Sequence, residues 1–255
     1  MHVATIGGGP PLVLLHGWAM HAGIFGPLVD RLREDFTLHL VDLPGHGIYR
    51  DSPLPLDLEA VAAAVAARTP PAPWLGWSLG GLVALHAAQA RPAAVRGLVM
   101  LCASPRFVRS EDWPQGMDPS VFETFARELA RDYRGTIDRF LMLEAQGSDH
   151  VREELRLLRA QVFAVCEPSA ARLAEGLAVL KDSDLRAGLP ALQVPSLWIA
   201  GRRDRLVFPQ AMEAAASQAP HARFLRIEHG GHAPFLSHGD EVADALRAFH
   251  AALAA

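Results

Sequence analysis

The feature that most constrains this chain is a regular alternation of short apolar runs with segments of helical periodicity. Short apolar runs bounded by Gly and Pro are typical of buried parallel strands, and the segments between them have the spacing of helices that cover a sheet. We therefore predict an α/β fold with a mostly parallel central sheet flanked by helices. The predicted strands are residues 12–15, 37–42, 74–76, 95–101, 196–200 and 224–227, and the predicted helices around them are 24–34, 56–68, 79–90, 210–216 and 240–252.

The middle of the chain has a different pattern. An all-helical block inside an α/β chain is typical of a lid, and Pro105 and Pro190 near its two ends suit sharp changes of chain direction. We expect an α/β core formed by residues 1–104 and 190–255, with an inserted helical lid at 105–189. The alternative is that these helices only cover a face of the sheet. The predicted lid helices are 120–133, 136–146, 150–165 and 169–181.

Composition excludes several classes of protein. With 255 residues, 50% of them hydrophobic, and a net charge of -4, the chain is neither disordered nor suited to coating nucleic acid. No apolar run reaches the roughly 18 residues of a membrane span, and the N-terminus lacks the basic start and apolar stretch of a signal peptide. We expect a soluble cytoplasmic monomer without a metal or organic cofactor, in which Cys102 and Cys166 are buried free thiols.

The strongest local motif is Gly76-Trp77-Ser78-Leu79-Gly80, which follows a predicted strand and precedes a predicted helix. A strand that enters a helix through so tight a turn forces the central residue into a strained conformation, and small neighbours leave room for it. The serine is thereby pushed out above the sheet at a helix N-terminus, where free N–H groups favour developing negative charge. The motif indicates a nucleophilic serine, and the alternative is a glycine-rich packing turn.

A nucleophilic serine needs a base and an acid that orients the base, and both follow Ser78 in the chain. Asp204 comes just after the predicted strand 196–200, and His232 lies in a Gly-flanked loop after the next strand. This order is the one that an α/β sheet with a serine nucleophile requires. We therefore predict that Ser78, Asp204 and His232 form a catalytic triad for acyl transfer.

Three neighbouring residues are rivals for these roles. His229 lies in the same loop as His232, but His232 has glycines immediately before it and a helix approach after it, so we favour His232. Asp42 also ends a predicted strand. Because it precedes Ser78, we expect it to be a structural acid that bonds its own loop. We expect His46 to be a solvated loop histidine.

Acyl transfer also needs two N–H donors for the oxyanion of the intermediate. We expect one from the backbone of Leu79, next to the nucleophile. The other is the backbone N–H of Trp18 in the loop after the first predicted strand, because Gly17 lets this loop pass close to the serine. The Trp18 indole is expected to line the acyl pocket, and the alternative is an ordinary core aromatic residue.

Together these motifs resemble the pimeloyl-acyl-carrier-protein methyl ester carboxylesterases of biotin synthesis, a family within the α/β hydrolases. The resemblance extends from about residue 12 to about residue 249, and Trp18 and Trp77 are among its narrower signals. It implies a serine carboxylesterase that hydrolyses the methyl ester of pimeloyl-acyl-carrier protein. The motifs that carry it are LLHGW at 14–18, FTLHLVDLPG at 36–45, WLGWSLGGLV at 74–83 and HAPF at 232–235.

The resemblance also implies substrate contacts from the predicted lid. At one of these positions the family has a neutral amide side chain, whereas this chain has Glu144. Four lid arginines would face the acidic carrier protein, three of them on one helix face, and the alternative is a solvated face paired with lid acids. The implied substrate contacts are Trp18, Ser78, Leu79, Phe140, Leu141, Met142, Leu143, Glu144 and His232, and the implied carrier-docking residues are Arg139, Arg152, Arg156 and Arg159.

Two other functions fit the same motifs. A generalist short-chain carboxylesterase, or a carbon-carbon bond hydrolase, would use the same triad on small substrates. A non-catalytic module would use the site only to bind a ligand or a carrier protein. Turnover of carrier-bound against free esters separates the first from the carrier-specific enzyme, and any turnover at all excludes the second.

Overall fold

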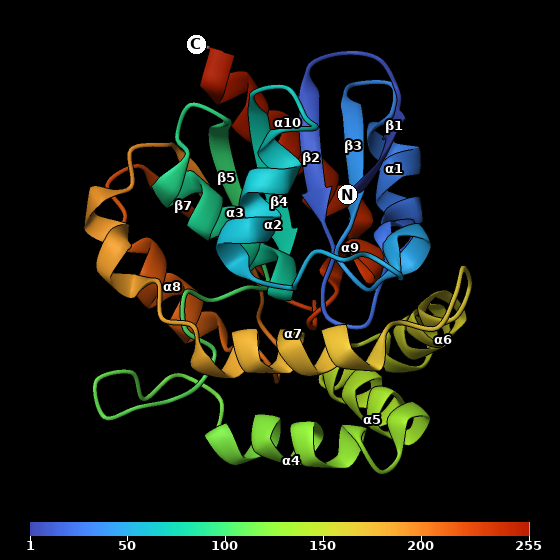
Figure 1. The fold of residues 1–255 in the computed structure, drawn as a ribbon. Coiled ribbons are helices and arrows are strands. Elements are labelled where there is room, and N and C mark those ends of the chain that lie inside the picture. Colours follow the sequence, from blue (N-terminus) through green and yellow to red (C-terminus); the bar gives the residue numbers. More distant parts are fainter. Residues whose placement is uncertain (255) are drawn as a thin grey trace.

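A seven-stranded sheet forms the centre of the molecule (Figure 1). The structure is a computed structural model that describes residues 1–254. The strand order is β1-β3-β2-β4-β5-β6-β7, in which β1 is antiparallel to β3 and all other neighbours are parallel. The parallel strands therefore end at one common edge, where the loops that follow them gather. The strands are β1 (His2–Ile6), β2 (Pro11–Leu15), β3 (Thr37–Asp42), β4 (Ala72–Trp77), β5 (Val95–Leu101), β6 (Ser196–Gly201) and β7 (Ala222–Ile227).

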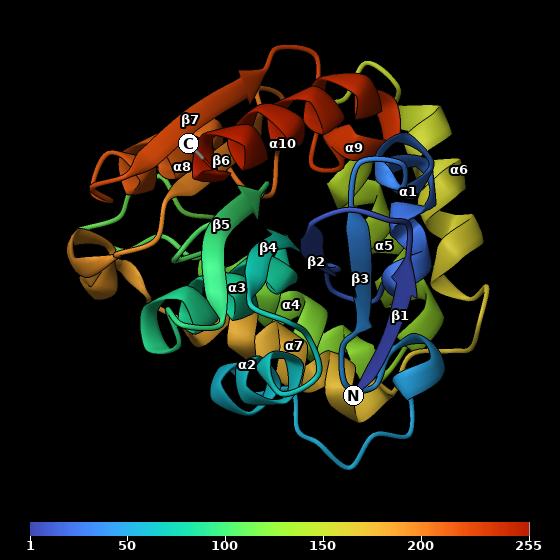
Figure 2. The same cartoon turned by 90° about the horizontal axis from the view of Figure 1, so that it is seen from above.

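Helices cover both faces of the sheet (Figure 2). α1 (Gly26–Leu32) and α10 (Gly239–Ala254) pack together on one face, and α2 (Leu58–Ala66) and α3 (Leu79–Ala90) pack together on the other. This arrangement confirms the predicted α/β fold. No helix within residues 1–254 has the length and apolar character needed to cross a membrane. The remaining helices outside the middle segment are α8 (Pro209–Ala216), α9 (Pro234–Ser237) and the 3-10 helices η1 (Ala22–Phe25), η2 (Gly47–Tyr49) and η3 (Arg186–Ala191).

The predicted strands are all present, but β1 is not among the predictions. β1 lies at the edge of the sheet, bonds only to β3 and has no buried residue. A strand with so little burial needs no strong apolar pattern, so its sequence carries a weak signal. One predicted helix, 24–34, is also divided, because η1 precedes α1 at Gly26.

Between β5 and β6 the chain leaves the sheet and forms four helices, as predicted. They lie beyond the edge at which the parallel strands end (Figure 1), and residues 105–189 are called the cap segment below. α7 packs on α3 and α4, and α6 packs on α9. The cap segment therefore covers the loops that follow the strands. Its helices are α4 (Pro119–Leu129), α5 (Tyr133–Ala145), α6 (Val151–Val162) and α7 (Ala170–Asp182).

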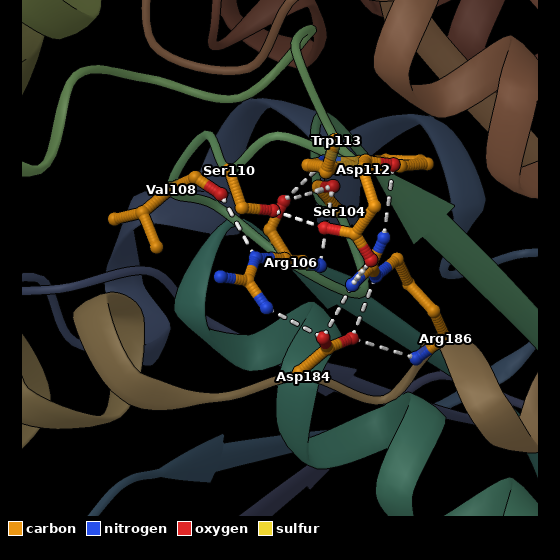
Figure 3. A network of polar contacts seen from close by, with 8 residues as sticks. All are labelled: Ser104, Arg106, Val108, Ser110, Asp112, Trp113, Asp184 and Arg186. Atoms are coloured by element: carbon orange, nitrogen blue, oxygen red, sulfur yellow. Dashed lines mark hydrogen bonds and ion pairs between the residues drawn. The ribbon is translucent and has the colours of Figure 1, made fainter.

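An ion-pair network joins the two ends of the cap segment (Figure 3). Arg106 donates to Asp184 at 2.6 Å, and Arg186 donates two further hydrogen bonds to the same carboxylate at 2.7 and 2.8 Å. Arg186 also donates to Asp112 at 2.8 Å and lies over the ring of Trp113. The hydrogen bonds from Arg186, and then from Arg106, hold the pKa of Asp184 well below its usual range. This network ties the chain that enters the cap segment to the chain that leaves it.

Candidate active site

Ser78 lies at the sharp turn between β4 and α3. Its φ is +53° and its ψ is -119°, a conformation that is strained for any residue with a side chain. The turn leaves no room at Gly76, where a Cβ would lie 2.2 Å from the carbonyl oxygen of Gly80. The Ser78 Oγ is buried and has no hydrogen-bond partner. The local geometry therefore matches the elbow that the motif predicts.

The predicted acid and base meet in the loops after β6 and β7. The Nδ1–H of His232 donates to Oδ2 of Asp204 at 2.7 Å, and both side chains are fully buried. The other oxygen of Asp204 accepts the backbone N–H groups of Leu206 and Val207 at 2.8 and 2.9 Å. These bonds fix the imidazole so that only Nε2 is free, and Nε2 is buried without a partner, like the Oγ of Ser78. A base oriented in this way can accept the proton of a serine hydroxyl.

The surroundings raise the pKa of His232 above its ordinary value. Burial is the largest single influence and opposes the charged imidazolium. The charge of Asp204 and the hydrogen bond to it act in the other direction and prevail, with smaller contributions from Glu144 and Glu154. A higher pKa makes the imidazole a stronger proton acceptor. Within residues 1–254 no group of three or more metal-ligating side chains lies close enough together to hold a metal ion.

Two of the rivals occupy other positions. His229 is exposed and forms a hydrogen bond with Asp149 at 2.9 Å, so it does not reach the buried serine. Asp42 accepts backbone N–H groups from Ala22 at 2.8 Å and from Ile48 at 3.0 Å. The prediction that Asp42 is a structural acid is therefore confirmed, although it bonds a second loop besides its own.

The expectation that His46 is solvated is wrong. Its ring is fully buried 5.2 Å from the ring of His16, and its Nδ1–H donates to the carbonyl of Pro44. His16 accepts the N–H of Leu43 at Nε2, so its Nδ1 carries the hydrogen and donates to the carbonyl of Gly17 at 2.8 Å. Burial lowers the pKa of both histidines to about 3. The two neutral rings therefore hold the loops after β2 and β3 together.

The loop after β2 passes directly over the elbow. A Cβ at Gly17 would lie 3.1 Å from the Trp77 ring and 3.2 Å from the Cβ of Ser78. Within the described residues no hydrogen bond uses the backbone N–H of Trp18 or Leu79. Leu79 is the first residue of α3, so its N–H has no acceptor within the helix. Both predicted oxyanion donors are therefore available close to the serine.

Residues of the cap segment close the space next to Trp18. The indole N–H of Trp18 donates to the carbonyl of Leu173 in α7 at 2.8 Å, and its ring lies 4.5 Å from the ring of Phe140 in α5. Both aromatic side chains are fully buried. Leu141 is also buried, and Leu143 is half-buried. An apolar interior shared by the core and the cap segment therefore adjoins the oxyanion loop.

The two other predicted lid contacts have opposite surroundings. Met142 is 43% exposed, because a helix turns by about 100° per residue and carries this position away from the buried side of α5. This geometry argues against the expected contact of Met142 with substrate. Glu144 is fully buried, and the charges of His232 and Asp204 both affect it. Glu144 is therefore a buried residue of α5 whose protonation Asp204 and His232 influence, and its contact with substrate stays a prediction.

The four predicted docking arginines divide into two pairs. Arg139 and Arg159 form ion pairs within the cap segment, and Arg159 does so through hydrogen bonds of 2.6 and 2.8 Å to Asp138. Arg152 and Arg156 are exposed on α6, and they form no ion pair with any described residue. Only the second pair is available to a partner without first breaking an existing ion pair.

Sequence reasoning missed a second role of the elbow motif. The indole N–H of Trp77 donates to the backbone carbonyl of His232 at 2.8 Å, so the residue before the nucleophile also fixes the loop of the base. The available signal was an indole, which seeks an acceptor when it is buried. Nearby, Cys102 is buried as predicted and contacts the carbonyl of Gly231, whereas Cys166 is only partly buried.

The sheet is mostly parallel and covered by helices, and the buried serine lies at the edge where its strands end. This combination is typical of a class of hydrolases, and it does not by itself identify one enzyme. The family model described as "alpha/beta hydrolase fold" matches residues 10–239, and the chain belongs to that family. A solved esterase from Exiguobacterium antarcticum has the same fold, with a TM-score of 0.87 at 23% identity, covering 97% of this chain and 94% of that chain.

Curated proteins similar to this chain carry a more particular name. A Stenotrophomonas maltophilia (strain K279a) protein is 60% identical over 253 residues, which cover 99% of this chain and 97% of that protein. A Xanthomonas campestris pv. campestris (strain B100) protein is 58% identical over 253 residues, which cover 99% of this chain and 100% of that protein. Both are named pimeloyl-[acyl-carrier protein] methyl ester esterase.

Proposed function

We propose that this protein is a serine carboxylesterase that hydrolyses the methyl ester of pimeloyl-acyl-carrier protein, in biotin synthesis, to pimeloyl-acyl-carrier protein and methanol. The observation that carries this proposal is the 58–60% identity, over nearly the whole chain, to esterases of that name. The protein is a carboxylic ester hydrolase of the α/β hydrolase family. The buried site supplies the chemistry for this reaction without a metal or an organic cofactor.

The first half of the reaction forms an acyl-enzyme. The Oγ of Ser78 attacks the ester carbonyl while Nε2 of His232 takes the hydroxyl proton, and Asp204 holds the imidazolium that results. The N–H groups of Trp18 and Leu79 stabilise the oxyanion. The bond from the carbonyl carbon to the methoxy oxygen then breaks, and His232 gives its proton to the leaving group, which departs as methanol.

The second half restores the serine. Water attacks the acyl carbonyl while His232 accepts a proton from it, and the same two N–H groups hold the second oxyanion. The bond to Oγ then breaks, and the proton on His232 returns to Ser78. The product leaves with a free carboxyl group in place of the methyl ester.

The cap segment acts as a lid in this proposal. Because Ser78 and His232 are fully buried, substrate reaches them only when residues 105–189 move relative to the core of residues 1–104 and 190–255. Trp18, Phe140 and the neighbouring leucines of α5 form the wall of the acyl chain. Their apolar surface suits a methylene chain and gives no reason to bind a charged one.

The partner is an acyl-carrier protein that bears the pimeloyl methyl ester. Arg152 and Arg156 are the residues best placed to meet its acidic surface or phosphopantetheine phosphate, because they are exposed and form no ion pair with any described residue. Arg139 and Arg159 would have to exchange their present partners. A cytoplasmic location and a monomeric state stay predictions.

Mass spectrometry with two substrates tests the proposal. The purified protein is incubated with pimeloyl-acyl-carrier-protein methyl ester and, separately, with free dimethyl pimelate, and loss of the methyl group is followed. We expect the carrier-bound ester to react with much the higher kcat/KM, and Ser78→Ala to abolish both reactions while circular dichroism stays unchanged. Equal turnover of both esters supports a generalist esterase. Methyl loss unaffected by Ser78→Ala overturns the serine mechanism.

A further inference from the structure

The peptide group that joins Gly17 to Trp18 is bonded on its carbonyl side by the side chain of His16. The Nδ1–H of His16 donates to the carbonyl oxygen of Gly17 at 2.8 Å, and the backbone N–H of Met20 donates to the same oxygen at 3.3 Å. All of these residues are buried. The N–H of this peptide group belongs to Trp18 and is one of the two proposed oxyanion donors. His16 therefore bonds to the opposite end of the group that would bind the oxyanion.

The two ends of a peptide group are coupled. The group is planar, and this one is trans, so its C=O and N–H point in opposite directions and a fixed carbonyl also fixes the direction of the N–H. A hydrogen bond accepted by the carbonyl polarises the group and makes its N–H a stronger donor. A charged oxyanion gains more from such a donor than a neutral ester carbonyl does.

The backbone of this loop is strained and needs support. Ala19, which follows Trp18, has a φ of +62°, in the left-handed region that residues with a Cβ rarely adopt. A conformation of this kind persists only where surrounding contacts hold it. Without the bond from His16, the peptide group would be freer to turn. The Trp18 N–H would then no longer be held in one direction.

His16 is itself fixed by the loop after β3. Its Nε2 accepts the backbone N–H of Leu43 at 3.0 Å, which leaves the hydrogen of the neutral ring on Nδ1. Because burial lowers the pKa of His16 to about 3, the ring keeps this one donor at every pH used to assay an esterase. The neighbouring His46 has no such connection. Its Nδ1–H donates to the carbonyl of Pro44, within its own loop, at 2.9 Å.

We propose that His16 is a positioning residue for ester hydrolysis, whose Nδ1–H orients and polarises the Gly17–Trp18 peptide group so that the Trp18 N–H stabilises the oxyanion. This inference rests on the proposed esterase function and on Trp18 as an oxyanion donor. The oxyanion exists in the transition state and the tetrahedral intermediate, and not in the bound ester. Loss of the bond from His16 should therefore lower kcat and leave KM nearly unchanged.

Two substitutions separate the donor of His16 from its acceptor. His16→Asn places an amide N–H near the position of Nδ1, so it can donate to Gly17 but does not reach Leu43. His16→Gln reaches Leu43 with its amide oxygen but has no donor near the position of Nδ1. On p-nitrophenyl butyrate we expect kcat to fall about twentyfold in His16→Gln and about threefold or less in His16→Asn, with KM within about twofold in both. Chemical unfolding should rank their stability in the opposite order, because His16→Asn leaves the buried Leu43 N–H without an acceptor.

Inhibition by an alkyl trifluoromethyl ketone measures the oxyanion site directly. The Oγ of Ser78 adds reversibly to the ketone carbonyl, and the adduct carries an oxyanion. Its Ki should rise in His16→Gln by the same factor by which kcat/KM falls, and it should stay near the wild-type value in His16→Asn. His46→Gln is the matched control, because His46 is equally buried but bonds to Pro44. Its kcat and Ki should stay within about twofold of the wild type even where its stability falls.

Several results would overturn the role of His16. A folded His16→Gln with the wild-type kcat does so, and so does a lower kcat with an unchanged Ki. Activities that follow stability, with His16→Asn the slower enzyme, show a purely structural residue. If His16→Gln fails to fold, His16→Asn decides alone, and a loss of kcat above about tenfold in that folded variant contradicts the proposal. Hydrolysis that survives in Ser78→Ala overturns the esterase mechanism itself, whatever His16 does.

Discussion

Asp204 uses both of its carboxylate oxygens, one for His232 and one for the backbone N–H groups of Leu206 and Val207. The backbone bonds fix the carboxylate, and the fixed carboxylate then fixes the ring. At the scale of single residues, the orientation of the base therefore depends on two backbone N–H groups that follow Asp204 in its loop. Such support is what allows one imidazole nitrogen to stay free in a buried site.

The first prediction concerns the acid side of the pH profile. Esterase activity should rise with pH through a midpoint above 6.5, because only neutral His232 can accept the proton and Asp204 raises its pKa against the effect of burial. Asp204→Asn should lower the midpoint and reduce kcat by about 10³-fold or more. Initial rates on p-nitrophenyl butyrate between about pH 5 and pH 8 check this. A flat profile, with chemistry shown to limit the rate, would contradict it.

The second prediction concerns stability and involves Glu144. Its folded-state pKa of about 8 lies above the ordinary 4.5, so between these values the folded protein holds a proton that the unfolded chain releases. The free energy of unfolding should therefore fall as pH rises through this window, by up to about 1.4 kcal/mol per pH unit. Glu144→Gln should remove this part of the slope, and Glu153→Gln, an exposed change on α6, should keep it. Urea unfolding at several pH values measures both, and identical slopes in the two variants would refute the assignment.

At the scale of elements, burial decides how clearly a strand or helix can be recognised from its sequence. Strands buried in the middle of the sheet, such as β4 and β6, have continuous apolar sequences and were predicted. The edge strand β1 was not predicted, because it pairs on one side only and buries no side chain, so its sequence needs no apolar pattern. The cap helices α4 and α6 have one strongly apolar face each and were predicted within a few residues.

The third prediction concerns the ends of the cap segment. Asp184→Ala should lower the free energy of unfolding by about 1 kcal/mol, because it leaves Arg106 and Arg186 without their shared acceptor. Asp182→Ala removes an exposed carboxylate that only pairs with Lys181 at 3.5 Å, and it should change stability by less than about 0.5 kcal/mol. Chemical unfolding compares them. Equal effects in the two variants would show that the network of Figure 3 adds nothing.

The fourth prediction concerns α6 and its exposed arginines. Arg156→Glu should lower kcat/KM for the carrier-bound ester about tenfold at low ionic strength, since repulsion then replaces attraction to an acidic partner. Hydrolysis of p-nitrophenyl butyrate should stay within about twofold. Arg96→Glu is the control, because Arg96 is exposed near the N-terminal end of β5, whereas the cap segment follows the C-terminal end of that strand. Unchanged carrier turnover in both Arg152→Glu and Arg156→Glu would place the docking surface elsewhere.

At the scale of the whole molecule, some features of the site can be predicted from the order of residues along the chain. Others depend on how the cap segment packs on the core. The order of Ser78, Asp204 and His232 and their places after strands were sufficient to predict that they gather at one edge. The burial of His46 and of Glu144 was not predictable, because it depends on which helix of the cap segment covers which loop. Their residue types suggest solvent, and only tertiary contacts place them inside.

The complete enclosure of Ser78 and His232 has a kinetic consequence. With residues 105–189 acting as the lid proposed above, each catalytic cycle includes an opening that admits substrate and one that releases product, so the opening frequency is an upper limit on turnover. The same limit applies to covalent inactivators. Organophosphonates that differ widely in intrinsic reactivity would then converge, at saturating concentration, on one inactivation rate. That common rate would be a direct measure of how often the lid of this enzyme opens.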